Sequence, residues 1–193
     1  MIKKIGILSS HNGSGYITID EACKNQVLNA EVAVVISNNS NANVLNSASQ
    51  RKTPSFVINN NLFPNEDLDK KITSLFVEYG CDYIFLSGYM KKLESKLISK
   101  FENKIINSHP ALLPKFGGKG MYGRFVHEAV IAANEKVSGV TIHFVNEEYD
   151  KGAFILQNSL EVSQNMTVEE LEDNIKKLES TSIVEALQKL INQ

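Results

Sequence analysis

The sequence predicts an α/β fold with a Rossmann-like, mostly parallel twisted sheet, helices on both faces, and a long C-terminal helix. Short apolar runs rich in Ile, Val and Phe recur along the first two thirds of the chain. Amphipathic stretches separate these runs, as crossover helices separate parallel strands. In the last third the apolar residues alternate with period two, which indicates mixed strands there.

The first half of the chain supplies four predicted strands and three predicted helices. The strands are the apolar runs at residues 4–9, 31–37, 55–58 and 82–87. The helical stretches between them occupy residues 14–25, 43–51 and 66–80. The third helix carries apolar residues on one face and ends at Gly80; they are Leu68, Ile72, Leu75 and Phe76.

The second half predicts a short helix, a fifth strand, a further helix, two neighbouring strands and a closing helix. These elements fall at residues 94–101, 104–108, 125–134, 138–145 and 153–162, with the closing helix beginning after Thr167. Thr167 and Glu170 have the spacing of a capping box. No linker composition separates the parts, so we expect one domain over residues 1–193, with a nucleotide-binding half at 1–100 and a catalytic half at 101–193.

Composition places the chain among ordinary globular proteins. Of its 193 residues 42% are hydrophobic and 22% charged, and the net charge is −2, so neither nucleic acid nor a membrane surface is an expected partner. Cys23 and Cys81 lack metal-like spacing, which favours reduced thiols. No apolar run is long enough for a signal or membrane segment, so we expect a soluble cytoplasmic protein.

Asn107 and His109 are the strongest candidates for chemistry. Both follow a predicted strand, and residues two apart in an extended segment point the same way. An amide and a protonated imidazole together suit an oxyanion, provided that a carboxylate lies near the imidazole. The loop between the last two strands offers Glu147, Glu148 and Asp150, and Asp150 is the most constrained of them. The alternative is that Asp150 only caps a turn.

Two glycine-containing segments allow other interpretations. Residues 11–15 join a strand to a helix, so their backbone could receive a phosphate or could form a plain turn. Residues 118–123 match the glycine spacing of a dinucleotide site, but they follow no strand directly, and we reject that interpretation. A mobile loop over a site, with Lys119 reaching an anion, and an ordinary surface loop both remain open.

The four histidines do not indicate a metal site. None of His11, His109, His127 and His143 pairs with another ligand at zinc-binding spacing. His143 alternates with core residues and is expected to be a buried, hydrogen-bonded structural residue. His127 lies on a helix face, where we expect it to support the structure or the site indirectly.

Several segments together resemble the folate-dependent formyltransferase superfamily, and within it the phosphoribosylglycinamide formyltransferases. They are "SSHNGSG", "FLSGYMKKL", "NSHPALLPKF" and "GVTIHFVNEEYDKGAFILQ". The resemblance covers nearly the whole chain. It implies transfer of a formyl group from 10-formyltetrahydrofolate to the amine of glycinamide ribonucleotide in purine synthesis, with small-molecule substrates, no metal, and a monomer or homodimer.

The resemblance also implies roles for individual residues. The catalytic triad falls on Asn107, His109 and Asp150. The phosphate of the ribonucleotide falls on Gly13, Ser14 and Gly15, and Glu179 falls near its amine end. The folate-binding set falls on Met90, Lys91, Lys92, Leu93 and Asn107. The chain departs from the family at Lys151 and Gly15, where Gly and Asn are common. The arginine that the family carries on the folate side, ahead of the fourth strand, has no counterpart here, and Asn65 or Glu66 falls near that position.

Related enzymes share the same triad and are the rival predictions. Formyltetrahydrofolate deformylases carry an extra N-terminal domain, and methionyl-tRNA formyltransferases add a C-terminal barrel with a basic surface. This chain begins with its first strand and ends after one long helix, which favours the ribonucleotide transferase over these and over sugar-nucleotide formyltransferases. A binding protein without turnover would not need the triad, and a flavodoxin-like protein would have a wholly parallel sheet.

Overall fold

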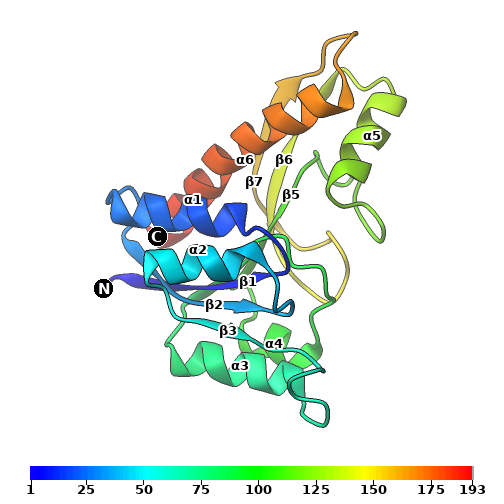
Figure 1. Cartoon of the computed structure of the whole chain (residues 1–193). Coiled ribbons are helices and arrows are strands. Elements are labelled where there is room, and N and C mark those ends of the chain that lie inside the picture. The colour runs from blue at the N-terminus through cyan, green and yellow to red at the C-terminus, as the bar shows by residue number, and fades with distance from the viewer. Residues whose placement is uncertain (193) are drawn as a thin grey trace.

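The computed structural model describes residues 1–192, and its core is a single seven-stranded sheet (Figure 1). The strand order is β3-β2-β1-β4-β5-β6-β7. The strands are β1 (Lys3–Ser9), β2 (Ala30–Ser37), β3 (Ser55–Val57), β4 (Tyr83–Leu86), β5 (Ile105–His109), β6 (Val137–Phe144) and β7 (Phe154–Glu161). Strands β1 to β5 pair in parallel, whereas β5–β6 and β6–β7 are antiparallel. The predicted change to mixed strands in the last third is therefore confirmed.

Helices cover both faces of this sheet. They are α1 (Ser14–Lys24), α2 (Asn43–Arg51), α3 (Leu68–Glu78), α4 (Ser95–Lys100), α5 (Arg124–Ala132) and α6 (Val168–Ile191). One buried cluster joins the sheet to α1, α2, α5 and α6, and a second joins it to α3 and α4. The two clusters arise because alternate residues of a strand point to opposite faces: Ile7 belongs to the first and Leu8 to the second.

The helix ends follow from local sequence. Thr167 and Glu170 form the predicted capping box, in which each side chain binds the other residue's backbone N–H. Asp67 accepts a hydrogen bond from the Lys70 amide at the start of α3. The buried carboxylate of Asp69 accepts from the Lys96 amide at 2.9 Å and so ties α3 to the start of α4. The bonds of Asp67 and Asp69 therefore fix α3 and α4, the two helices on the face of the sheet opposite α1 and α6.

The direction of the strands decides where functional groups can meet. All of β1, β4 and β5 end on the same edge of the sheet, as parallel strands must. The antiparallel β6 then returns along β5 and places His143 opposite Asn107. Among the described residues no helix is both long and apolar enough to cross a membrane.

We expect Gly6→Ala to destabilise the fold. Gly6 lies on β1, and a Cβ built there would come within 2.5 Å of the buried ring of Phe76 on α3. Overpacking of this kind costs about 1–3 kcal/mol of unfolding free energy, which urea denaturation would measure.

A double-variant cycle supplies the control. Combining Gly6→Ala with Phe76→Leu makes room for the methyl group, so the pair of changes should cost less than the sum of the single changes. Full additivity, or an unchanged Gly6→Ala protein, would contradict the close contact between β1 and α3.

Candidate active site

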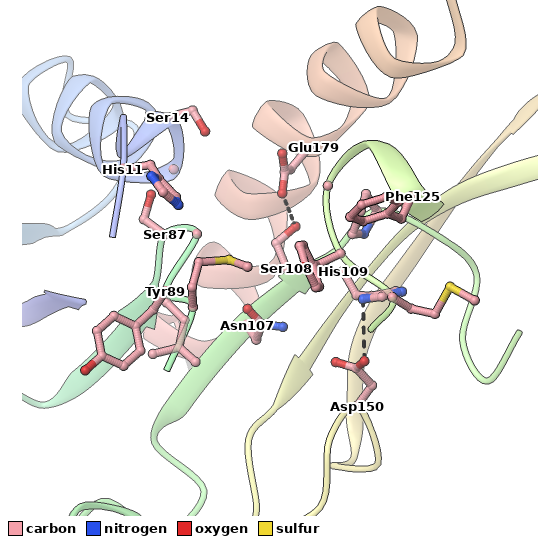
Figure 2. A pocket seen from close by; sticks show the side chains of 18 of the residues that line it. His11, Ser14, Ser87, Tyr89, Asn107, Ser108, His109, Phe125, Asp150 and Glu179 are labelled. Carbon is pink, nitrogen blue, oxygen red and sulfur yellow. Dashed lines mark hydrogen bonds and ion pairs between the residues drawn. The ribbon is translucent and has the colours of Figure 1, made fainter. Parts of the chain in front are cut away.

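A cavity of about 680 Å³ lies where β1, β4 and β5 end. Its wall combines residues from the turn after β1, the segment after β4, strand β5, the loop before β7, and helix α6. In Figure 2 Asp150 lies against His109 and Glu179 lies against Ser108, and these residues and Asn107 line the same cavity. The sheet therefore brings together the triad residues predicted from sequence, although their roles in catalysis remain predictions.

His109 is a buried side chain in the cavity wall, and both of its ring nitrogens face polar groups. It is 3% exposed, and its Nε2 lies 2.7 Å from the carbonyl oxygen of Phe116. A carbonyl only accepts, so Nε2 carries a hydrogen and donates it. The other ring nitrogen, Nδ1, faces Asp150 Oδ2 at 3.7 Å (Figure 2). Nδ1 is therefore the position where a proton would convert His109 to its charged form.

Two opposing effects set the protonation of His109. Burial lowers the pKa of His109 below its ordinary value, and it outweighs the raising effects of the Asp150 charge and the Phe116 carbonyl. A buried imidazolium is costly because its hydration is lost. The neighbouring Asp150 carboxylate offsets part of this cost. The imidazolium of His109 would become favourable when negative charge develops beside the ring.

Asp150 is held as a carboxylate. Burial acts to raise the pKa of Asp150, but the contact with the His143 ring, the Gly118 amide and the charge of His109 outweigh it and hold that pKa below its ordinary value. The Gly118 N–H donates to Asp150 Oδ2 at 2.8 Å, and His143 Nε2 lies 3.6 Å from Oδ1. The backbone of Asp150 lies in the left-handed region at φ 57°, and its side chain faces Gly118, His109 and His143.

His143 connects Asn107 to this carboxylate, a link that sequence reasoning missed. Its Nδ1 lies 2.8 Å from the Phe144 carbonyl oxygen and donates to it. Its Nε2 lies 3.3 Å from Asn107 Nδ2 and 3.6 Å from Asp150 Oδ1, so this one ring atom stands between the amide and the carboxylate. The contact orients the Asn107 amide and leaves its second N–H for a ligand. The expectation of a buried, hydrogen-bonded residue was correct, but the pairing of β5 with β6 had to be known to find this partner.

Thr141 is a second residue that the sequence did not single out. Its buried hydroxyl donates to the Ala111 carbonyl at 2.7 Å and accepts from the Leu113 amide at 3.0 Å and from Gln157 Nε2 at 2.9 Å. These bonds fasten the segment that follows His109 to β6 and β7. No sequence signal identifies Thr141, because a threonine on a predicted strand is ordinary.

Glu179 meets β5 from the opposite face of the strand. The Ser108 hydroxyl donates to Glu179 Oε1 at 2.6 Å, because Ser108 points away from its neighbours Asn107 and His109 (Figure 2). Burial raises the pKa of Glu179, against the lowering effects of Ser108 and Lys176. Glu179 therefore lies in the cavity wall. Its contact with a substrate amine stays a prediction.

The turn after β1 has the geometry of an anion site. Gly13 has φ 68°, and a Cβ there would approach Val44 to 2.3 Å, so only glycine fits. Ser14 and Gly15 line the cavity at the start of α1. The Tyr16 amide donates a hydrogen bond to Ser87 Oγ at 3.1 Å. The Ser14 and Gly15 amides are left to bind a ligand.

The residues predicted to bind folate divide between two adjoining cavities. Met90 and Lys91 line the main cavity, whereas Lys92 and Leu93 line a second cavity of about 450 Å³. Lys91 lines both, so the two spaces adjoin at this residue. The Met90 amide donates to Ser10 Oγ at 2.8 Å and is therefore not free for a ligand.

The glycine loop at residues 118–123 forms a wall of the main cavity. All six of its residues line that space, and its first amide binds Asp150. The loop interpretation that placed it over a site is thus supported, and Lys119 lies on the cavity side. Within residues 1–192 no group of three potential metal-ligating side chains occurs.

Comparisons with known proteins agree with this architecture. Residues 3–187 match the family described as Formyl transferase. Phosphoribosylglycinamide formyltransferase of Haemophilus influenzae is 37% identical over 179 residues, covering 92% of this chain and 82% of the relative. The chloroplastic enzyme of that name from Arabidopsis thaliana is 36% identical, covering 96% of this chain but 64% of the relative, so the chain spans less than two thirds of it.

A solved structure is similar over almost the same extent. Glycinamide ribonucleotide transformylase 1 from Symbiobacterium toebii superimposes with a TM-score of 0.91 at 30% sequence identity. The match covers 99% of this chain and 88% of that structure.

The structure predicts that Asp150→Asn lowers the pKa of His109 further. The carboxylate raises that pKa in the native protein, and the amide removes its charge. Nitrogen-15 NMR of the imidazole would follow the titration. A midpoint at the same or a higher pH in the variant would show that Asp150 does not act on His109.

Thr141→Val should destabilise the protein by about 1–3 kcal/mol, because it leaves buried polar groups without their partner. Thr141→Ser keeps the hydroxyl and is the matched control. Thermal unfolding of both variants measures the difference, and equal stability of the two would contradict the bonding described for Thr141.

Proposed function

The chain belongs to the formyl transferase family, and from that premise we propose that it transfers the formyl group of 10-formyltetrahydrofolate to the amine of glycinamide ribonucleotide, a step of purine biosynthesis. Relatives that carry the name of this activity support the proposal. The observation that carries it is the position of His109, buried between the Phe116 carbonyl and Asp150 with Asn107 two residues away.

The chemistry requires stabilisation of one oxyanion. The amine forms a bond to the formyl carbon, and the carbonyl electron pair moves onto oxygen to give a tetrahedral intermediate. Donors aimed at that oxygen stabilise it more than the starting carbonyl. In our proposal the free N–H of Asn107 and the imidazolium of His109 supply them, and the formyl oxygen takes over the Nε2–H that Phe116 accepts in this structure.

Proton movement completes the transfer. The attacking nitrogen loses a proton, the N10 atom of the folate gains one, and the bond between N10 and the formyl carbon breaks. The carboxylate of Asp150 keeps His109 charged while the oxyanion exists and lies close enough to take part through water. No covalent link to the protein is formed, and holding both substrates together supplies much of the rate.

The two substrates would approach from different sides. The phosphate of the ribonucleotide would bind the amides of Ser14 and Gly15, after the turn at Gly13, and its amine end would lie near Glu179. The folate would use Met90 and Lys91 and extend toward Lys92 and Leu93 in the second cavity. This arrangement brings the formyl carbon and the amine together at Asn107.

Hydrolysis of the formylfolate is the second candidate, since the same three residues could direct water instead of an amine. The anion site at the start of α1 favours an amine substrate that carries phosphate, because hydrolysis has no use for it. We further propose small-molecule substrates alone, a cytoplasmic location and a monomer or homodimer, which sedimentation analysis would test.

Purified protein mixed with both substrates should release tetrahydrofolate only when the ribonucleotide is present. Absorbance of the folate follows the reaction. Release at the same rate without the amine would identify a hydrolase and reject the proposed transfer.

Replacing the donors to the oxyanion should slow the chemical step. His109→Ala and Asn107→Ala should each lower kcat by about 100-fold or more, as loss of an oxyanion donor does in other enzymes. Lys92→Ala, at the second cavity, should change the folate KM far more than kcat. Unchanged kcat in His109→Ala would exclude the mechanism.

A further inference from the structure

The hydroxyl of Ser87 has a hydrogen that the protein itself does not use. Ser87 directly follows β4, is 5% exposed and lines the main cavity. Its Oγ accepts from the Tyr16 amide at 3.1 Å, and within residues 1–192 its own O–H meets no acceptor. A buried hydroxyl usually donates as well as accepts, because a polar group that is buried without a partner loses its hydration. The Ser87 hydrogen is therefore available to a molecule in the cavity.

Comparison within the molecule shows that this arrangement is unusual for the chain. Other hydroxyls of the described residues accept from a backbone amide, and each of these also donates to an oxygen: Ser10, Ser37, Thr141 and Thr167. Ser87 accepts in the same way but lacks the second bond. Of these hydroxyls Ser87 alone lines the main cavity. The missing acceptor therefore points to a ligand.

The backbone holds the side chain of Ser87 toward α1. The Ser87 amide donates to the Leu8 carbonyl at 2.8 Å, which continues the contact between β4 and β1. Alternate residues of an extended segment point to the same face. Ser87 therefore shares the face of Phe85, which packs in the buried cluster that includes α1. In Figure 2 Ser87 lies on the same side of the cavity as Ser14, the first residue of α1.

The hydroxyl occupies the place that a side chain at residue 15 would need. A Cβ built on Gly15 would lie 3.1 Å from Ser87 Oγ and 2.7 Å from the ring of Phe85. Residue 15 therefore cannot carry a side chain unless its neighbours move, and the polar group beside its backbone comes from Ser87 instead. Together with the bond to the Tyr16 amide, these distances place Ser87 Oγ at the proposed phosphate site.

The free amides of α1 indicate which ligand atom meets Ser87. Amides in the first turn of a helix have no partner within the helix and point in one direction. An oxygen that accepts from the Gly15 amide therefore approaches the hydroxyl that already lies on the Tyr16 amide. Phosphate oxygens are strong acceptors. They suit a site in which two amides and a hydroxyl all donate.

We infer that Ser87 donates its hydroxyl hydrogen to the phosphate of the ribonucleotide substrate and so contributes to recognition of that substrate. The inference rests on the proposed function, because the phosphate belongs to the substrate named there. One oxygen atom then has two tasks: it accepts from the Tyr16 amide, and it donates to the anion that the same turn binds. Because β1 holds the backbone of Ser87, the donor is in position before the substrate arrives.

The test compares Ser87→Ala and Ser87→Cys with the wild-type protein. Alanine removes the donor, whereas cysteine keeps nearly the same size but has only a weak S–H donor. In both variants we expect the KM for the ribonucleotide to rise by about tenfold or more, as loss of a hydrogen bond to a charged group predicts. The inhibition constant of inorganic phosphate, added as a competitor of the ribonucleotide, should rise with it. The kcat and the KM for 10-formyltetrahydrofolate should stay unchanged, because the phosphate takes no part in the bond changes.

Tyr16→Phe is the matched control for the structural role of Ser87. It removes the buried hydrogen bond from Tyr16 Oη to Thr53 Oγ1 at 2.8 Å and so weakens the same turn of α1, but its side chain lies outside the cavity wall. We expect Tyr16→Phe and Ser87→Ala to lower the melting temperature alike, by about 2–4 °C. Only Ser87→Ala should raise the ribonucleotide KM and the inhibition constant of phosphate.

The outcomes separate this inference from the proposed function. Wild-type protein that turns over the ribonucleotide, with unchanged KM and phosphate inhibition in both Ser87 variants, overturns the inference alone. An equal rise of the ribonucleotide KM in Tyr16→Phe overturns it as well, since Ser87 would then act only through the structure of α1. Wild-type protein without ribonucleotide turnover overturns the proposed function and this inference with it.

Discussion

The carboxylate of Asp150 is the interaction on which the rest of the site depends. Its two oxygens face His109 and His143, and the Gly118 amide donates to one of them. A carboxylate buried without such partners would be protonated and would lose its influence on His109. The negative charge of Asp150 therefore depends on three elements: the loop before β7, the glycine loop at residues 118–123 and the antiparallel β6.

The change of strand direction after β5 makes this convergence possible. The chain passes from β5 through α5 and then enters β6, which runs antiparallel to β5. The antiparallel β6 puts His143 opposite Asn107 and ends opposite Ile106. The loop that follows then folds back along β5, so that Asp150 reaches the ring of His109. The Thr141 hydroxyl then fastens the intervening segment, so that the Phe116 carbonyl reaches His109.

Features that depend on the local residue pattern could be predicted from the sequence. Contacts that depend on how two strands pair could not. Apolar periodicity was sufficient for the sheet, the helices and the mixed last third, and the segment around Asn107 and His109 could be recognised from residue type alone. The partner of Asn107 is 36 residues away and is defined only by strand pairing. Phe116 acts through its carbonyl, which every residue possesses, so its identity carries no signal.

The balance between burial and the charge of Asp150 decides how His109 can act in catalysis. Burial makes the imidazolium unfavourable in the protein, and Asp150 offsets that cost only in part, because the pKa of His109 still lies below its ordinary value. Interactions accelerate a reaction only when they are stronger in the transition state than before it. A cation that is incompletely stabilised by Asp150 gains most when an oxyanion forms beside it. The same burial that disfavours the charge in the resting protein therefore strengthens its attraction for the intermediate.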